Sequence, residues 1–269
     1  MTPQPGRPAT PFGVSSRRWS RAELVLAVVL LVLAAAAWVL TSRLATPDMR
    51  AGVLTGAPAM NAMDGAMRPL PAEAALFLGT WVVMMAAMML PGIVPFSVSM
   101  GRLLSSRGRR QTGLLAGYFT VWAVIGVAAF AFVRGLEAVV MSPSPAAVRA
   151  GGAVLLVAGL YQLTPLKRVC LRHCRSPAAL LLKHGETVRR PFGTFRVGLS
   201  HGGYCLGCCW ALMAVLLAAG VMNLVWMGLL AVVVALEKVT RHGEVVSRVV
   251  GAVLLLAATV LLVQPGLLS

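Results

Sequence analysis

Acidic residues are scarce in this chain, and its content of charge is low. The 269 residues include 8 Asp and Glu, and charged residues make up 12% of the total, against about a quarter in soluble globular proteins. The sequence also lacks catalytic triads, phosphate-binding loops, nucleotide fingerprints and paired carboxylates within its apolar runs. These absences exclude the common hydrolase and NTP-driven classes, and we do not expect an enzyme.

Apolar residues are abundant instead. They account for 58% of the sequence, and the mean hydropathy is +0.83. A net charge of +16 would suit nucleic-acid binding if the basic residues lay on one exposed face among aromatic ones. Here they fall in short clusters between apolar runs, which is the pattern that sets membrane topology. The sequence therefore indicates a protein whose partner is the lipid bilayer, and no nucleic acid.

Several uncharged runs are long enough to cross about 30 Å of hydrocarbon. The run at residues 197–236 would reach roughly 60 Å as one helix, so it must fold back, and Gly220 and Asn223 mark the natural break. We predict an all-α polytopic transmembrane helix bundle of about seven spans. The predicted spans lie near residues 24–40, 76–100, 114–133, 150–166, 198–220, 224–238 and 248–264.

The basic residues also predict the orientation. With a cytoplasmic N-terminus, nineteen of the 24 Lys and Arg residues lie in inner segments. We expect this orientation in a bacterial cytoplasmic (inner) membrane, with the C-terminus outside. The Pro-rich start predicts a disordered cytoplasmic tail over residues 1–20, followed by a single transmembrane domain over residues 21–269. The first apolar run is longer than a typical signal-peptide core, so we interpret it as an anchor.

The stretch HGGYCLGCCW, residues 201–210, gathers three cysteines and a histidine in a predicted span. At 100° per residue these side chains and a later methionine share one helical face. Reactive groups in a span are expected to face the bundle interior, and sulfur with imidazole suits Cu(I) or zinc. The alternative is simple packing, since cysteine is small and apolar. The predicted metal ligands on this face are His201, Cys205, Cys208, Cys209 and Met213.

A methionine cluster, WVVMMAAMMLP at residues 81–91, lies in the second predicted span. Met84 and Met88 are one turn apart, and Met85 and Met89 broaden the same side. Depths counted from opposite surfaces put this cluster and the cysteines in the middle of the membrane. We therefore expect Met84 and Met88 to join the cysteines in a Cu(I) environment, although methionine is also a common filler of apolar packing.

Soft ligands also flank the predicted spans. On the outer side, residues 60–67 read MNAMDGAM, which suits capture of Cu(I). On the inner side, CLRHCR at residues 170–175 places two thiols and an imidazole on one helical turn, where a reducing compartment preserves thiols. A basic segment facing anionic lipid is the alternative there. The predicted secondary metal relay consists of Met60, Met63, Met67, Cys170, His173 and Cys174.

Four further side chains are assigned structural or gating roles. Glu237 and Lys238 close the sixth predicted span at the cytosolic surface, where snorkelling and a local ion pair explain them by default. Tyr161 lies near the inner end of the fourth span and is expected to hydrogen-bond a neighbour. Trp210 directly follows the cysteines.

Five motifs together carry a resemblance to a known family. They are WVVMMAAMMLP, YQLTPLKRVCLRHCR, GGYCLGCCWALM, GVMNLVWMG and ALEKV, and they extend from about residue 80 to 240. With this combination the chain resembles a bacterial uncharacterised-domain family of predicted metal-binding integral membrane proteins, some of whose members are described as copper chaperones. The resemblance implies a multi-pass protein that handles metal. The positions within matching motifs are Met84, Met88, Cys170, Cys174, Cys205, Cys208, Cys209, Met213, Glu237 and Lys238.

The function we predict is binding of a soft metal for copper transfer, transport or delivery, with Cu(I) favoured over zinc or mercury. Uptake of mercuric ion is a variant of this function. A membrane thiol-disulfide oxidoreductase is the alternative from another class, because Cys205 and Cys208 have the redox spacing. A further alternative is an assembly subunit of a copper enzyme. The partners expected are accordingly a metallochaperone or a copper enzyme.

Overall fold

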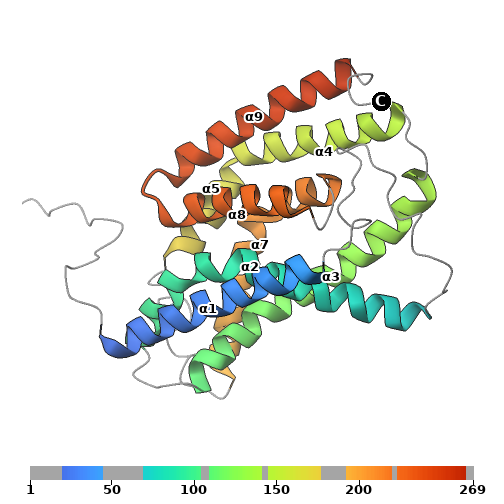
Figure 1. Ribbon diagram of the computed structural model, residues 1–269. Coiled ribbons are helices and arrows are strands. Elements are labelled where there is room, and N and C mark those ends of the chain that lie inside the picture. The colour runs from blue at the N-terminus through green and yellow to red at the C-terminus, as the bar shows by residue number, and fades with distance from the viewer. Residues whose placement is uncertain are drawn as a thin grey trace, which may run out of the picture.

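The fold is described by a computed structural model over residues 20–44, 69–103, 109–140, 145–176, 192–219 and 223–264. Within these ranges the chain forms eight helices and no strand (Figure 1), so the prediction of an all-α protein is confirmed. Nearly all of the predicted tail, together with Met60, Met63 and Met67 of the predicted relay, lies outside the described residues. The helices are α1 (Arg21–Leu44), α2 (Leu70–Leu103), α3 (Arg109–Val140), α4 (Pro145–Leu163), α5 (Pro165–Arg175), α7 (Gly193–Ala219), α8 (Leu224–Val239) and α9 (Gly243–Val263).

Five of these helices are long and apolar enough to cross a membrane: α1, α2, α3, α7 and α9. The bent pair of α4 and α5 brings the number to six if it is counted as one span. The remaining helix, α8, has 16 residues, whereas a straight crossing takes about 20. Its N-terminus is capped by the Asn223 side chain, which accepts hydrogen bonds from two backbone amides. The predicted fold-back near residue 220 lies between α7 and α8.

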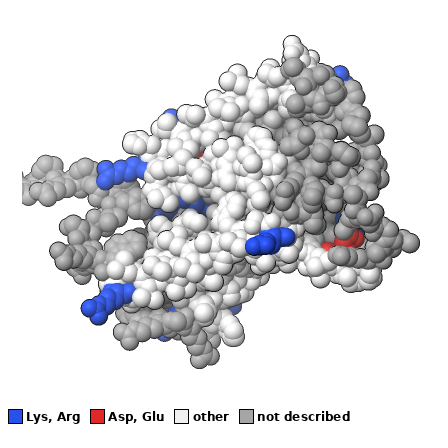
Figure 2. All heavy atoms as spheres, in the orientation of Figure 1, with Lys and Arg blue, Asp and Glu red and all other residues white. Residues whose placement is uncertain are grey.

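Large aliphatic side chains cover much of the outer surface. Val25, Val28 and Val32 of α1 and Val253 and Leu256 of α9 are each more than half exposed. Among the described residues, the face shown in Figure 2 is made mainly of uncharged side chains. Such a surface is costly in water and suits contact with lipid.

Three helix pairs build most of the bundle, namely α1 with α2, α3 with α7, and α4 with α9 (Figure 1). The α3 and α7 backbones touch through glycine. A Cβ atom added at Gly198 would lie 2.1 Å from the carbonyl oxygen of Leu114, and one at Gly117 would lie 2.1 Å from that of Phe195. Only glycine permits this approach, which brings the cysteine face of α7 against α3.

Helix α5 leaves the direction of α4 by 66°. The cause is local: Thr164 caps α5 by accepting a hydrogen bond from the amide of Lys167, and Pro165 occupies its first turn, so α4 cannot continue through it. The buried side chains of α5 are Lys167, Leu171 and Cys174, spaced as one helical face. This face packs against α7 and α8.

Candidate metal centre

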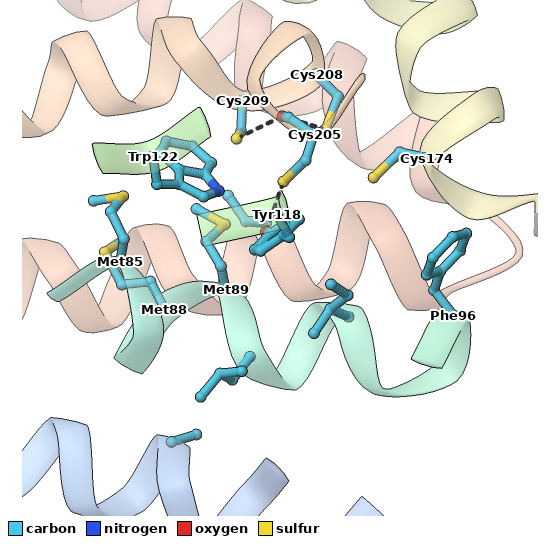
Figure 3. Close-up of a cluster of buried hydrophobic side chains, with 14 of the residues drawn as sticks. Met85, Met88, Met89, Phe96, Tyr118, Trp122, Cys174, Cys205, Cys208 and Cys209 are labelled. Carbon is cyan, nitrogen blue, oxygen red and sulfur yellow. Dashed lines mark hydrogen bonds between the residues drawn. The ribbon is translucent and has the colours of Figure 1, made fainter. Parts of the chain in front are cut away.

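Three thiols from two helices meet in the interior. The Sγ atoms of Cys174 on α5 and of Cys205 and Cys208 on α7 all lie within 4.8 Å of one another, and all three residues are buried (Figure 3). Sulfur atoms bound to one ion at about 2.3 Å lie up to roughly 4.6 Å apart. The group therefore needs at most a small closure to hold a soft metal ion.

Two polar side chains contact the sulfur of Cys205. The hydroxyl of Tyr118 on α3 lies 3.0 Å from this sulfur, and the ammonium of Lys238 on α8 donates to it at 3.0 Å. The same ammonium donates to the Sδ atom of Met89 on α2 at 3.5 Å. Helices α3 and α8 thus each supply a polar group to the Cys205 sulfur, and α2 supplies a second sulfur to the same ammonium; all of these residues are buried.

The interpretation of Glu237 and Lys238 as a local ion pair at the surface is wrong. Both residues are buried, and Glu237 pairs with Lys167 of α5, whose ammonium lies 2.9 and 2.8 Å from the two carboxylate oxygens. Adjacent residues on a helix point about 100° apart. Lys238 therefore reaches the thiols, while Glu237 reaches α5.

Further hydrogen bonds surround the Lys167–Glu237 pair. The Gln162 amide donates to Glu237 at 3.2 Å and also accepts a hydrogen bond from Lys167, and the Ser247 hydroxyl of α9 donates to the Gln162 carbonyl at 3.0 Å. A buried ion pair is favourable only when hydrogen bonds satisfy its remaining polar atoms, as they do here. This network joins α4, α5, α8 and α9 beside the metal centre.

The predicted methionine ligands are buried in the core cluster that contains the thiols. The methionine sulfur that contacts a polar group of the centre is nevertheless that of Met89, which points toward Tyr118 and Cys205 (Figure 3). The side chain of Met88 lies beside that of Met85, away from Cys205 (Figure 3). Met84 and Met213 are buried, and Met213 lies two turns beyond Cys205 on α7. Their roles as ligands remain predictions.

The other two predicted ligands of α7 lie beside the three thiols. Cys209 donates its thiol hydrogen to the carbonyl of Cys205 at 2.9 Å and is not a member of the group. His201 is buried and stacks on Phe96 with ring centroids 3.7 Å apart. Its Nδ1 atom finds no hydrogen-bond partner within the described part of the chain.

Of the predicted inner relay, Cys174 joins the central group because the bend before α5 turns it toward α7. Cys170 is half-buried, and its sulfur lies against Gly207, where an added Cβ atom would come within 2.7 Å. His173 stacks on Tyr204 with centroids 4.8 Å apart. Both residues therefore border α7 without belonging to the three-thiol group.

Tyr161 and Trp210 form a contact between α4 and α7. Their rings meet edge to face with centroids 4.9 Å apart, and the Tyr161 hydroxyl donates to the Gly207 carbonyl. This hydrogen bond agrees with the neighbour contact that the sequence predicts for Tyr161. The pair holds α7 at the level of its cysteines.

Three residues in or beside the centre are not singled out as site residues by the sequence. Met89 only widens the predicted methionine face, Lys167 is one of the basic residues that predict the topology, and Tyr118 belongs to no motif. The sequence does indicate the position of Lys167, because it precedes Leu171 and Cys174 by four and seven residues and so shares their helical face. The position of Tyr118 beside Cys205 depends on the packing of α3 against α7, and no local sequence pattern reveals that packing.

The fold and the site together define a helical protein with membrane-length apolar helices and a buried thiol group that can hold a metal. Residues 78–261 match the PpoB2 family, described as copper chaperones, and the chain belongs to this family. This finding confirms the resemblance inferred from the motifs. The matched range includes all five cysteines and the methionines of α2. No curated protein and no solved structure shows significant similarity to the chain.

Proposed function

We propose that the protein binds Cu(I) through Cys174, Cys205 and Cys208 and acts within the membrane as a copper chaperone that transfers the ion to a partner. The observation that carries this proposal is the meeting of three buried thiols from α5 and α7 within 4.8 Å. Thiolates select soft ions such as Cu(I). Membership of a copper chaperone family supports copper as the cargo.

The donor set favours copper over zinc. Among the described residues the group contains sulfur alone, with no imidazole or carboxylate, and the thioether of Met89 contacts the same ammonium as the Cys205 thiol. Structural zinc sites are almost always four-coordinate and built from thiolate, imidazole or carboxylate ligands. Three thiols and a thioether are a better match for Cu(I).

A route for transfer begins at Cys170. This thiol is half-buried, precedes Cys174 by one helical turn, and packs against Gly207, the neighbour of Cys208. An ion that exchanges ligands one at a time would pass from Cys170 to Cys174 or Cys208 of the buried group. The partner is a metallochaperone or a copper enzyme, and Met60, Met63 and Met67 are proposed to capture copper on the outer side.

The topology proposed is seven spans in a bacterial inner membrane, with the N-terminus in the cytoplasm and residues 21–269 as one domain. In this arrangement α8 is the sixth crossing, and its Glu237 end, α5 and the start of α7 share the inner half of the membrane. The contacts of Lys167 with Glu237 and of Cys174 with Cys205 and Cys208 support this placement. The positive-inside pattern supports it independently.

The proposed function is tested by the copper content of single-cysteine variants. Purified protein is loaded anaerobically with Cu(I) and exposed to a competing Cu(I) chelator. We expect Cys174→Ser, Cys205→Ser and Cys208→Ser each to lose retained copper. Cys209→Ser is the matched control, because serine preserves the hydrogen bond to the Cys205 carbonyl and Cys209 lies outside the group. Equal loss in all four variants, or no copper on the wild type, overturns the proposal.

The same three thiols also support a second candidate function, that of a thiol-disulfide oxidoreductase, because they lie close together. Two of three thiols within 4.8 Å can form a disulfide after a modest movement. Thiol trapping decides between the candidates. A reversible disulfide between Cys205 and Cys208 during turnover, in protein that retains no copper, would favour the oxidoreductase.

A further inference from the structure

Lys238 holds a positive charge against the sulfur atoms of the metal centre. Its side chain is 7% exposed, and its ammonium lies 3.0 Å from the Cys205 sulfur and 3.5 Å from the Met89 sulfur. A lysine is rarely buried without a carboxylate partner. Among the described residues the neighbouring carboxylate, Glu237, is bonded instead by Lys167 and Gln162.

Helix α2 provides the space that this lysine occupies. A Cβ atom added at Gly92 would lie 3.1 Å from Cδ of Lys238 and 3.8 Å from its Nζ. Gly92 lies one turn beyond Met89, so one face of α2 accommodates both the aliphatic stem and the ammonium. The side chain of Lys238 is therefore packed against the backbone of α2, with its ammonium turned toward the sulfur atoms and little of it in contact with solvent.

We propose that Lys238 is a specificity-determining residue, whose fixed positive charge makes the three-thiol centre select a monovalent soft cation over a divalent one. This inference rests on the proposed function. It goes beyond that function by assigning the choice between ions to a residue that is not a ligand. The assignment follows from Coulomb's law, in which the interaction energy of two charges is proportional to the magnitude of each charge.

Repulsion between the ammonium and a bound ion is proportional to the charge of the ion, so a divalent ion is repelled twice as strongly as a monovalent one at the same position. Salt screens this interaction little, because the centre is buried. Attraction between the ammonium and the thiolates is the same for both ions when the same thiols hold them. It therefore cancels from the ratio of the two affinities.

The test compares affinities for Cu(I) and Zn(II) in wild type, Lys238→Met and Lys238→Arg. Each ion is measured anaerobically by competition with a chelator of known affinity on the full-length protein in detergent. We expect Lys238→Met to raise the affinity for Zn(II) relative to Cu(I) by at least about tenfold. Lys238→Arg keeps the charge and is expected to change the ratio by less than about threefold.

An unchanged ratio in Lys238→Met, or an equal weakening of both ions, overturns the inference and reduces Lys238 to a packing role. If the Met variant fails to fold, Lys238→Gln provides a second neutral side chain with its own hydrogen-bond donors, and the same ratio is decisive. A wild type that binds Cu(I) at the three thiols, with no change of ratio in the neutral variants, refutes this inference alone. A wild type without Cu(I) refutes the proposed function and this inference with it.

Discussion

At the scale of single residues, neighbouring side chains on one helix have different roles. Cys208 and Cys209 both donate to the carbonyl of Cys205, at 3.1 and 2.9 Å, but of these two only Cys208 belongs to the three-thiol group. Lys238 contacts that same cysteine, while Glu237 contacts Lys167. A rotation of 100° per residue is sufficient to separate these partners. Substitutions at adjacent positions should therefore have different consequences.

The buried ion pair of Lys167 and Glu237 gives a prediction about stability. Replacing Lys167 by Met leaves the Glu237 carboxylate buried with its cation removed, and we expect a loss of about 3–5 kcal/mol in the free energy of unfolding. The double variant Lys167→Met/Glu237→Gln removes both charges and should recover most of that loss. Denaturant unfolding in detergent measures the three proteins. Additive losses in the double variant would contradict the account of the pair.

At the scale of elements, the metal centre depends on how helices are joined and how closely they pack. The sequence indicates the cysteine face of α7, because a 3.6-residue period is a local property. It does not indicate that Cys174 completes the group, because this contact depends on the 66° bend before α5 and on the surface to which α5 then packs. The fourth span predicted from sequence, residues 150–166, is one continuous helix, whereas the structure has a break at Thr164 between α4 and α5. Hydropathy alone does not reveal this bend.

Close packing of α3 on α7 gives a second prediction. Gly198→Ala introduces a Cβ atom 2.1 Å from the backbone of α3, which cannot yield as a flexible side chain would, so the helices must separate. We expect a loss of at least about 2 kcal/mol in the free energy of unfolding and weaker copper retention, because Tyr118 moves away from Cys205.

Gly203→Ala is the matched control on the same helix, since an added Cβ atom there meets nothing within 4 Å. This variant should match the wild type or exceed its stability slightly, because alanine favours helix more than glycine does. Similar thermal unfolding of the two variants would show that the α3–α7 approach is not as close as described.

At the scale of the whole molecule, hydropathy predicts the class of protein well and the number of crossings less well. Five helices satisfy the length and composition of a span, and the bent α4–α5 pair is a sixth when counted as one. The remaining predicted span, α8, is short and buries Met227, Leu230 and Val234 against its neighbours. A run of apolar residues does not distinguish lipid contact from protein contact, which is why sequence alone leaves this helix undecided.

The topology gives a third prediction, which concerns the two sides of the membrane. Fusions of a periplasm-dependent phosphatase after Leu44 and after Ser176 should be active and inactive, respectively, because these positions follow the first and fourth predicted spans. A cytoplasm-dependent fluorescent reporter at the same two positions should give the opposite pattern. Phosphatase activity at both positions would exclude the proposed seven-span orientation.

X-ray absorption at the copper edge, on the Cu(I)-loaded protein and on its Cys174→Ser variant, identifies the atoms that hold the ion. We expect a first shell of sulfur alone in the wild type, with one fewer sulfur in the variant. An unchanged copper–sulfur shell in Cys174→Ser, or a wild-type shell dominated by nitrogen or oxygen, would contradict the claim that α5 and α7 hold the ion together.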